Sequence, residues 1–422
     1  MKTRKLGMTV VGLLAMAYAA RADDWLDQLD ESMRVSFFKG IITARVSGLM
    51  DMEGYYTEQP NLGLLSNGGS FLFNPRLTIY IDVQITPAIY ISAEARVDRG
   101  FDPSNENLEA RFDQYSITYK PLSYVPVKFE AGKFASVVGT YSARYDSWDN
   151  PFINAPLPYE NPTSVNDRMV PASGEYFVDW RHAGEDSYDR LPIMWGPSYA
   201  SGFAVFGQVG ETIDLSAEVK NASISSRPEY WDYDSNFLRY PTWSGHADWR
   251  PSPTWQFGVS GSVGPYLRPG TTVGATDDHE EAATFPKGKG IGDYQQQTIA
   301  EDVTYEWRHW QIWAECFETR FQVPNVGDAD TLAYYLEAKY KFTPQFSAAL
   351  RWNQQLFSKV PSDDEDPGEM DQWGNDIWRI DAAVTYRWTP RIQTKLQYSF
   401  TDQNSGSRDE EHLVAGQLTV KY

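Results

Sequence analysis

The chain has 422 residues and a formal net charge of -20 at pH 7, with 57 acidic and 37 basic side chains. This acidic excess argues against a nucleic-acid partner, because phosphate backbones are bound by clustered Lys and Arg. The single cysteine, Cys316, cannot form an internal disulfide, so the fold is not a disulfide-stapled scaffold and must be stabilised by packing and sheet pairing.

The first 22 residues have the layout of a secretory signal peptide. Lys2, Arg4 and Lys5 precede an apolar run from Met8 to Met16, and residues 20–22 form an A-x-A cleavage site. A membrane anchor is disfavoured because this run is far shorter than the roughly 20 residues that a spanning helix needs. We therefore expect residues 1–22 to be removed during export.

Residues 23–40 are predicted to form an N-terminal periplasmic segment ahead of the main domain. Within it, Trp25, Leu26, Leu29 and Met33 recur at a spacing that places them along one side of a short helix. The rest of the chain, residues 41–422, is predicted to be one domain.

Apolar side chains occupy every second position through most of this domain. Between residues 71 and 85 the odd positions are apolar, whereas the even positions include Asn74, Arg76, Asp82 and Gln84. A period of two indicates β-strands, and the same alternation recurs at 89–97 and 332–340. Alternation alone does not separate a membrane barrel from a soluble sandwich, which alternates with its apolar face buried.

The alternating segments number sixteen, an even count that single-chain bacterial barrels require. The predicted strands are 41–56, 70–86, 89–101, 108–119, 127–135, 201–209, 213–222, 241–250, 255–264, 296–308, 309–319, 331–342, 345–354, 376–388, 391–401 and 412–422.

Short and long connections between these strands alternate in phase. Short connections contain turn residues such as Thr86-Pro87-Ala88 and Thr343-Pro344, and the long ones are 57–69, 136–200, 223–240, 265–295, 320–330, 355–375 and 402–411. Short turns at one end and long loops at the other are typical of outer-membrane barrels. The sequence therefore predicts an all-β fold, an antiparallel transmembrane β-barrel of about sixteen strands.

The chain resembles the bacterial porin superfamily over its whole mature length, and two features carry this resemblance. The long connection 136–200 lies between strands five and six, and the chain ends with Val414, Gly416, Leu418, Val420 and Tyr422 at alternate positions. The resemblance implies a loop that folds into the barrel and narrows the pore, a Gram-negative outer-membrane location, and recognition of the C-terminal Tyr422 by the outer-membrane assembly machinery. It is also compatible with a homotrimer.

If the apolar face meets lipid, the charged face points into the lumen. The predicted pore-lining residues are Arg45, Arg76, Asp82, Glu94, Arg96, Asp98, Lys128, Glu130, Arg351, Arg379, Asp381 and Arg387. Unpaired buried ions cost several kcal/mol each, so an interior this charged is expected to hold water. The alternative is that many of these residues pair across neighbouring strands and support the wall.

The 136–200 loop carries an acidic excess and several aromatic rings. Its predicted constriction residues are Asp146, Trp148, Asp149, Glu160 and Asp167. Opposite the arginines of the early strands, these carboxylates would set a field that orients polar solutes. The aromatic rings can stack on sugars, although packing of the loop against the wall is the commoner reason for them.

The leading functional hypothesis is a non-enzymatic porin for passive diffusion of small hydrophilic solutes and ions, with lipid as its surroundings. Acidic residues cluster in the 355–375 loop, at 363–366, and in the 402–411 loop, which favours weak cation selectivity through attraction at the mouth. A pore selective for anions or sugars is the alternative. No cofactor or metal is predicted, because the 363–366 cluster lacks the spacing of a calcium loop.

Other classes of function have less support in the sequence. The five histidines are far apart, and neither an H-E-x-x-H nor a G-x-S-x-G motif is present. An outer-membrane lipase or protease would need a Ser/His pair at the rim, and a structural or adhesive barrel would have a plugged lumen. Single-channel conductance separates these classes from a porin.

Overall fold

A computed structural model describes residues 25–58, 70–99, 108–121, 125–182, 190–233, 238–268, 271–273, 285–362, 368–404 and 410–422. The predicted signal peptide and residues 363–366 lie outside these ranges. Within them, no helix combines the length and the apolar character that crossing a bilayer requires.

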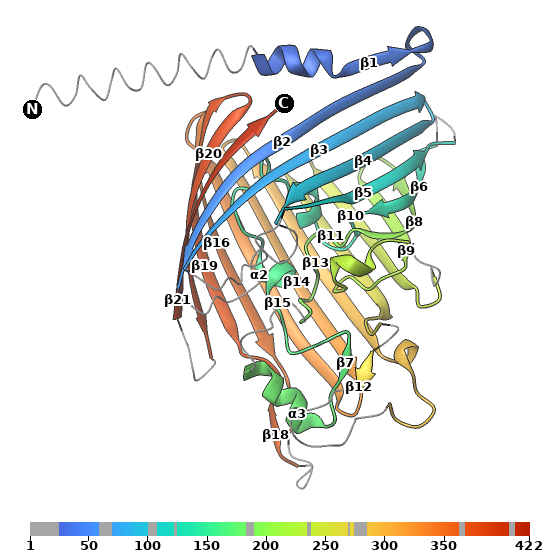
Figure 1. Cartoon of the computed structure of the whole chain (residues 1–422), viewed down its shortest axis with the longest axis vertical. Coiled ribbons are helices and arrows are strands. Elements are labelled where there is room, and N and C mark those ends of the chain that lie inside the picture. Colours follow the sequence, from blue (N-terminus) through green and yellow to red (C-terminus); the bar gives the residue numbers. More distant parts are fainter. Residues whose placement is uncertain are drawn as a thin grey trace, which may run out of the picture.

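Sixteen of the described strands form a closed antiparallel barrel (Figure 1). They are β2 (Ile42–Thr57), β3 (Phe71–Thr86), β4 (Ile89–Asp98), β5 (Glu109–Tyr119), β6 (Val127–Phe134), β8 (Ala200–Val209), β9 (Ile213–Lys220), β10 (Thr242–Ser252), β11 (Trp255–Pro265), β13 (Gln295–Trp307), β14 (Trp310–Val323), β15 (Gly327–Lys341), β16 (Phe346–Phe357), β19 (Ile377–Thr389), β20 (Ile392–Gln403) and β21 (Glu410–Lys421). The predicted all-β barrel of about sixteen strands is confirmed.

The barrel closes where β2 pairs with β21, the first and last of its strands. At the end of this seam the backbone N–H of Tyr422 donates to the carbonyl of Gly48 at 3.0 Å, and the N–H of Gly48 donates back at 2.9 Å. A Cβ atom at position 48 would lie 2.5 Å from the Tyr422 hydroxyl oxygen and 2.4 Å from the Thr78 carbonyl oxygen. Glycine is therefore needed for the C-terminal ring to lie over β2.

The burial pattern is the reverse of that of a soluble protein. On β20 the Leu396 side chain is 62% exposed while its neighbour Lys395 is only 2% exposed, and on β16 Leu350 is 58% exposed while Arg351 is fully buried. A contiguous apolar exterior of this kind would drive association in water. It is the outward face expected of a barrel surrounded by lipid.

The two ends of the barrel differ in their connections. The short-turn end, at the top in Figure 1, has the connections 87–88, 120–126, 210–212, 253–254, 308–309, 342–345 and 390–391. The opposite end, here called the long-loop end, has the connections 58–70, 99–108, 135–199, 221–241, 266–294, 324–326, 358–376 and 404–409.

One connection at the long-loop end is much shorter than predicted. We expected a loop over 320–330, whereas β14 and β15 continue into it and leave only residues 324–326 between them. Arg320 on β14 forms ion pairs with Asp328 and Asp330 on β15, at 3.0 and 2.7 Å. These charged residues interrupt the apolar alternation in the sequence, but they extend the hairpin by pairing across it.

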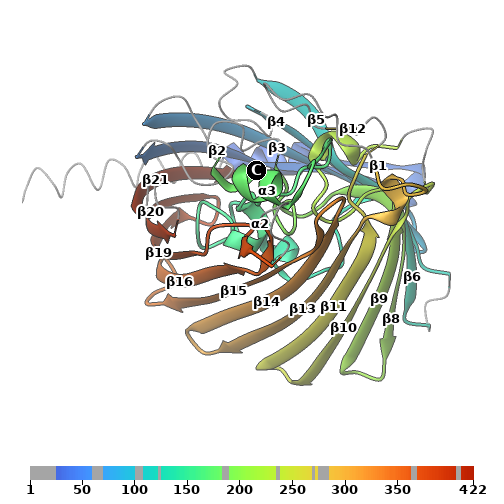
Figure 2. The same cartoon turned by 90° about the horizontal axis from the view of Figure 1, so that it is seen from below.

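The smaller elements lie mainly inside or at the long-loop end. They are β7 (Met169–Val170), β12 (Thr272–Val273), β17 (Lys359–Pro361), β18 (Met370–Gln372), α2 (Leu157–Glu160), α3 (Gly174–Asp179), η2 (Tyr141–Arg144), η3 (Trp180–His182), η5 (Pro228–Tyr230) and η6 (Ile291–Asp293). Figure 2 shows α2 and α3 within the ring of strands.

The N-terminal segment contacts the short-turn end. Residues 25–32 are helical, β1 (Arg34–Phe37) pairs with the start of β2, and η1 (Phe38–Gly40) joins them. Asp30 is buried and accepts hydrogen bonds from Arg34 at 2.9 Å and Arg45 at 3.1 Å, while Asp27 pairs with Arg391 at 2.6 Å. Leu26 is buried but Trp25 is exposed, so the predicted apolar side of this helix is only partly covered.

Candidate functional site: the barrel lumen

The connection 135–199, here called the inner loop, begins by following the inner wall of the barrel. The Ser136 hydroxyl donates to Glu218 on β9 at 2.8 Å, and the Thr140 backbone N–H donates to Glu315 on β14 at 2.6 Å. Farther along, the Arg144 guanidinium pairs with Glu337 on β15 at 2.6 Å. Residues 136–144 of the inner loop therefore run inside the barrel from β6 to β15.

The loop then contacts the wall formed by β16, β19 and β20. The backbone N–H of Ile153 donates to Gln397 at 2.6 Å, and the Asn161 amide donates to Gln355 at 2.9 Å. Arg351 donates to the Asn154 side chain at 2.6 Å. Polar side chains of the wall thus satisfy the backbone and amides of the loop, as buried polar groups require.

Two clusters of buried aromatic rings lie towards the long-loop half of the lumen. Trp373, Phe177, Phe321 and Tyr266 belong to one buried apolar cluster, in which the Phe177 and Trp373 rings stack at 5.7 Å between centroids. A second cluster, nearer the middle, packs Tyr141 and Tyr159 of the inner loop against Phe317 of β14.

Most aromatic rings of the inner loop support its packing. Tyr141, Phe152 and Tyr159 are fully or almost fully buried, and Phe152 lies beneath the Arg351 guanidinium at 4.3 Å. Trp148 instead lines a cavity, where Arg387 lies 5.2 Å from its ring. Packing against the wall therefore explains most of these aromatic residues. Among the described aromatic residues of the inner loop, Trp148 is the one that lines this cavity.

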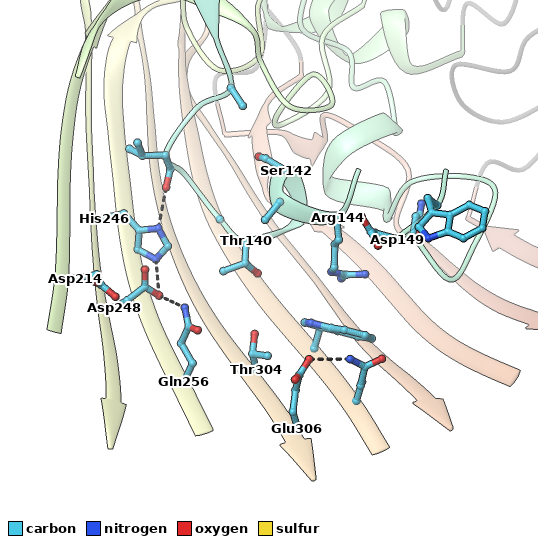
Figure 3. A pocket seen from close by; sticks show the side chains of 18 of the residues that line it. Thr140, Ser142, Arg144, Asp149, Asp214, His246, Asp248, Gln256, Thr304 and Glu306 are labelled. Atoms are coloured by element: carbon cyan, nitrogen blue, oxygen red, sulfur yellow. Dashed lines mark hydrogen bonds and ion pairs between the residues drawn. The ribbon is translucent and has the colours of Figure 1, made fainter. Parts of the chain in front are cut away.

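The short-turn half of the lumen contains a cavity of about 1360 Å³ (Figure 3). It lies between residues 136–151 of the inner loop and the inward faces of β6, β8 to β11, β13 to β16, β19 and β20. Ions and polar solutes could enter it from the short turns, since residues 120, 341 and 343–346 of that end also line it.

Charges of opposite sign lie on different arcs of the cavity wall. Acidic residues lie on the strands β9 to β13, where Asp214, Asp248 and Glu306 line the cavity. Basic residues include Lys339 and Lys341 on β15 and Arg387 on β19, and Lys128 on β6 and Lys395 on β20 also line the cavity. Separated rows of fixed charge produce a transverse field, which orients dipolar solutes.

The wall formed by β2 to β5 carries a dense ion-pair network. Arg76 pairs with Asp51 and Glu53, Arg96 with Glu94 and Asp113, and Arg111 with Asp98, at distances from 2.5 to 3.2 Å. All of these pairs join neighbouring strands except Arg96–Glu94, which lies within β4. Arg76, Glu94, Arg96 and Asp98 therefore pair with other wall residues and support the wall. Asp146 of the inner loop faces this wall, and burial raises the pKa of its carboxyl although Arg96 acts in the opposite direction.

Three predicted pore-lining residues lie beneath the inner loop. Arg351 and Arg379 both pair with Asp381, at 2.8 and 3.1 Å, and Arg379 also pairs with Glu160 of the loop at 2.5 Å. All three wall residues point inward and are buried. Their charges hold the loop in place and do not line the cavity.

The remaining predicted residues occupy three different places. Lys128, Glu130, Arg387, Trp148 and Asp149 line the cavity. Arg45 contacts Asp30 at the short-turn end, and Asp82 accepts a hydrogen bond from Tyr90.

Asp167 lies in the long-loop half, paired with Arg227 at 2.6 Å, and so is not part of the cavity. Burial raises the pKa of its carboxyl, and Arg227 opposes that shift.

Sequence reasoning did not single out a cluster that the structure forms on the acidic wall. His246, Asp248 and Asp302 place one ligand atom each within 4.8 Å of one another. Their positions fit the alternation of inward residues, because 246 and 248 share a face of β10 and 302 is inward on β13. The sequence therefore showed that all three side chains point inward. That they lie next to one another could be seen only from the register between the strands.

Comparisons with known proteins support the fold. No family model and no curated protein matches the sequence. Among solved structures, an anion-selective porin from Comamonas acidovorans has a TM-score of 0.55 and 9% identity, covering 90% of this chain and 100% of that one. The outer-membrane channel DcaP of Acinetobacter baumannii has a TM-score of 0.55 and 12% identity over 92% and 99% of the two chains. OmpF of Salmonella typhi has a TM-score of 0.54 and 11% identity over 92% and 100%. The chain therefore has the fold of porin barrels.

Proposed function

We propose that this protein is an outer-membrane porin that admits small hydrophilic solutes and ions by passive diffusion. The observation that carries the proposal is the charged cavity of about 1360 Å³ inside a barrel whose outer face is apolar. The apolar exterior can contact the hydrocarbon of the bilayer, and the charged interior can be hydrated by water. In this proposal the short turns face the periplasm and the long loops face outward.

The inner loop is proposed to form the constriction. It runs inside the barrel, contacts the wall from β9 to β20, and separates the cavity from the aromatic clusters of the long-loop half. Solutes would pass between this loop and the wall, where Trp148, Asp149 and Arg387 meet. The fixed charges there would favour polar solutes over apolar ones.

Selectivity is proposed to be weakly cationic at low salt. Glu369, Asp371, Asp402, Glu410 and Glu411 lie at the long-loop end within the described residues, and such charge attracts cations to the mouth. The anion-selective alternative rests on Lys339, Lys341 and Arg387 of the cavity, which form no ion pair among the described residues. Reversal potentials under a salt gradient distinguish the two.

Membrane insertion is proposed to use the C-terminal strand, with Tyr422 as the residue recognised by the assembly machinery. Three copies are proposed to associate through their apolar exteriors. Cross-linking of the protein in native membranes measures this directly. A ladder ending at three copies is expected, whereas a single monomer band would contradict a trimer.

The direct test of the function is single-channel recording of the purified protein in a planar bilayer. Stepwise conductance is expected, because the proposal requires a continuous aqueous path. A barrel that inserts and yields no conductance steps would instead be a plugged structural barrel, and the proposal would fail. Heat resistance of the same sample on a gel shows that the barrel is folded.

A further inference from the structure

The acidic wall of the cavity contains a group of side chains with the composition of a metal site. His246 Nε2 lies 3.1 Å from Asp302 Oδ2 and 3.5 Å from Asp248 Oδ1. Bonds of about 2.0–2.2 Å from zinc to nitrogen and oxygen, set at tetrahedral angles, place two ligand atoms about 3.3–3.5 Å apart. The two distances from His246 are thus close to those between ligands of one ion, and all three ligand atoms lie within 4.8 Å of one another.

Glycine on the middle strand allows the two carboxylates to converge. Asp248 on β10 pairs with Gly258 on β11, which pairs with Asp302 on β13. With strands about 4.8 Å apart, side chains two strands away normally meet the residue between them. A Cβ atom at position 258 would lie 2.2 Å from a carboxylate oxygen of Asp302, so the space above Gly258 is occupied by that carboxylate.

The orientation of the imidazole suits a metal ligand. His246 Nδ1 lies 2.8 Å from the carbonyl oxygen of Val137 in the inner loop, which can accept only a proton donated by the ring. A histidine that binds a metal commonly donates its other ring N–H to such a carbonyl. In the neutral ring this leaves the Nε2 lone pair directed at the carboxylates of Asp302 and Asp248. Figure 3 shows His246 beside Asp248.

No Lys or Arg neutralises the carboxylates of the cluster in the described part of the chain. Asp302 is 2% exposed, and its Oδ1 atom has no hydrogen-bond partner. Among the described residues, His246 is the ion-pair partner of both Asp302 and Asp248. Two carboxylates facing a ring nitrogen need a cation between them, either a proton or a metal ion.

The orientation of Asp248 and the access from the cavity also favour binding of an ion. Asp248 accepts a hydrogen bond from Gln256 at 2.7 Å, which holds the orientation of that carboxylate. His246, Asp248 and Gln256 line the cavity, so an ion can enter from water and can keep water as a further ligand.

We propose that His246, Asp248 and Asp302 bind one divalent transition-metal ion, with zinc as the representative. A mixed nitrogen and oxygen ligand set favours zinc, cobalt or nickel over magnesium and calcium, which prefer oxygen ligands alone. Because the imidazole of His246 is also hydrogen-bonded to the Val137 carbonyl, the ion would fix the start of the inner loop to the wall. This inference does not depend on the channel being open.

Isothermal titration calorimetry with zinc chloride tests the site by measuring zinc binding to the full-length mature barrel. The protein is kept in detergent and carries no histidine tag. One zinc ion per barrel is expected. His246→Gln and Asp302→Asn should each weaken binding at least tenfold, since each removes one ligand. Asp214→Asn is the matched control, because Asp214 lines the same cavity but pairs with Arg250, and its zinc affinity should be unchanged.

Gly258→Ala tests the geometry while keeping all three ligands. Its Cβ should displace the Asp302 carboxylate and weaken zinc binding. Magnesium and calcium should not compete at concentrations that saturate the site with zinc. The proposal is overturned if the unaltered protein takes up no zinc, if the ligand variants bind as it does, or if magnesium competes equally.

Anomalous diffraction at the zinc edge provides a test that needs no variant. Crystals grown with zinc should show a peak within about 2.3 Å of one atom from each of the three side chains. A crystal with no peak there would show that a proton alone links His246 to the carboxylates, and would overturn the proposal even if a variant failed to fold.

Discussion

The two halves of the lumen differ although the same strands line both. On β14, Phe317 and Phe321 face inward at the long-loop half and are buried in aromatic clusters, whereas Gln311 faces inward at the short-turn half and lines the cavity. On β15, Ala333 is buried in an aromatic cluster, whereas Lys339 lines the cavity. The inward face of a single strand thus changes from apolar, where the loops pack, to charged, where water is expected.

This difference adds to the polar contacts from Glu315, Glu337 and Arg351 that also hold the inner loop. Small and aromatic inward side chains provide a surface on which the loop buries apolar area, which stabilises it by about 25 cal/mol per Å². The polar and charged side chains of the other half offer no such surface. We therefore expect substitutions in the two halves to have different consequences.

The largest expected effect is from Phe317→Ala, in the packed half. Phe317 contacts Tyr159 of the inner loop, with the ring centroids 5.5 Å apart. Its loss should lower the free energy of unfolding by about 3–5 kcal/mol through lost burial and a cavity. The matched control is Gln311→Ala on the same strand, expected to change it by less than about 0.5 kcal/mol. Denaturant unfolding in detergent measures both, and equal losses would contradict the difference between the halves.

A smaller effect is expected from charge on the lipid face. Ile299 is exposed on the outside of β13, so Ile299→Arg should cost about 2–4 kcal/mol near the middle of the bilayer. Thr304 on the same strand faces the cavity, and Thr304→Arg should be tolerated. Folding into lipid vesicles measures the two free energies. A larger cost for Thr304→Arg would show that the cavity is not water-filled.

The smallest expected effect concerns the basic side of the cavity. Lys339→Gln combined with Arg387→Gln removes two positive charges from its wall. The reversal potential should shift towards cation selectivity at 0.01 M salt and much less at 1 M, because the screening length falls from about 30 Å to about 3 Å. An unchanged potential at low salt would mean that permeating ions do not pass this wall.

Sequence periodicity predicted the architecture but not the interior. An alternation of two is a local property, so the strands, their inward faces and the loop between β6 and β8 could be located without a structure. Whether Arg351 lines a pore or is buried under Asn154 depends on where a 65-residue connection packs, which is a long-range property. The approach of Asp302 to His246 likewise depends on register across β11.

The hairpin of β14 and β15 shows a different limit of prediction from the sequence. Arg320 and Asp330 read as loop residues because charge interrupts the apolar alternation, yet their mutual pairing extends both strands. Favourable cross-strand pairs are recognised only once the partner is known.

The central claim is that the inner loop, packed on the apolar half of the wall, limits a continuous water path through the charged half. Single-channel conductance of the full-length mature barrel and of a variant lacking residues 147–161 tests it most directly. Stepwise conductance is expected for both, with larger steps for the variant, provided each gives a heat-resistant band on a gel. Equal steps in the two proteins would show that the loop does not limit the path, and no steps in the intact protein would show that no path exists.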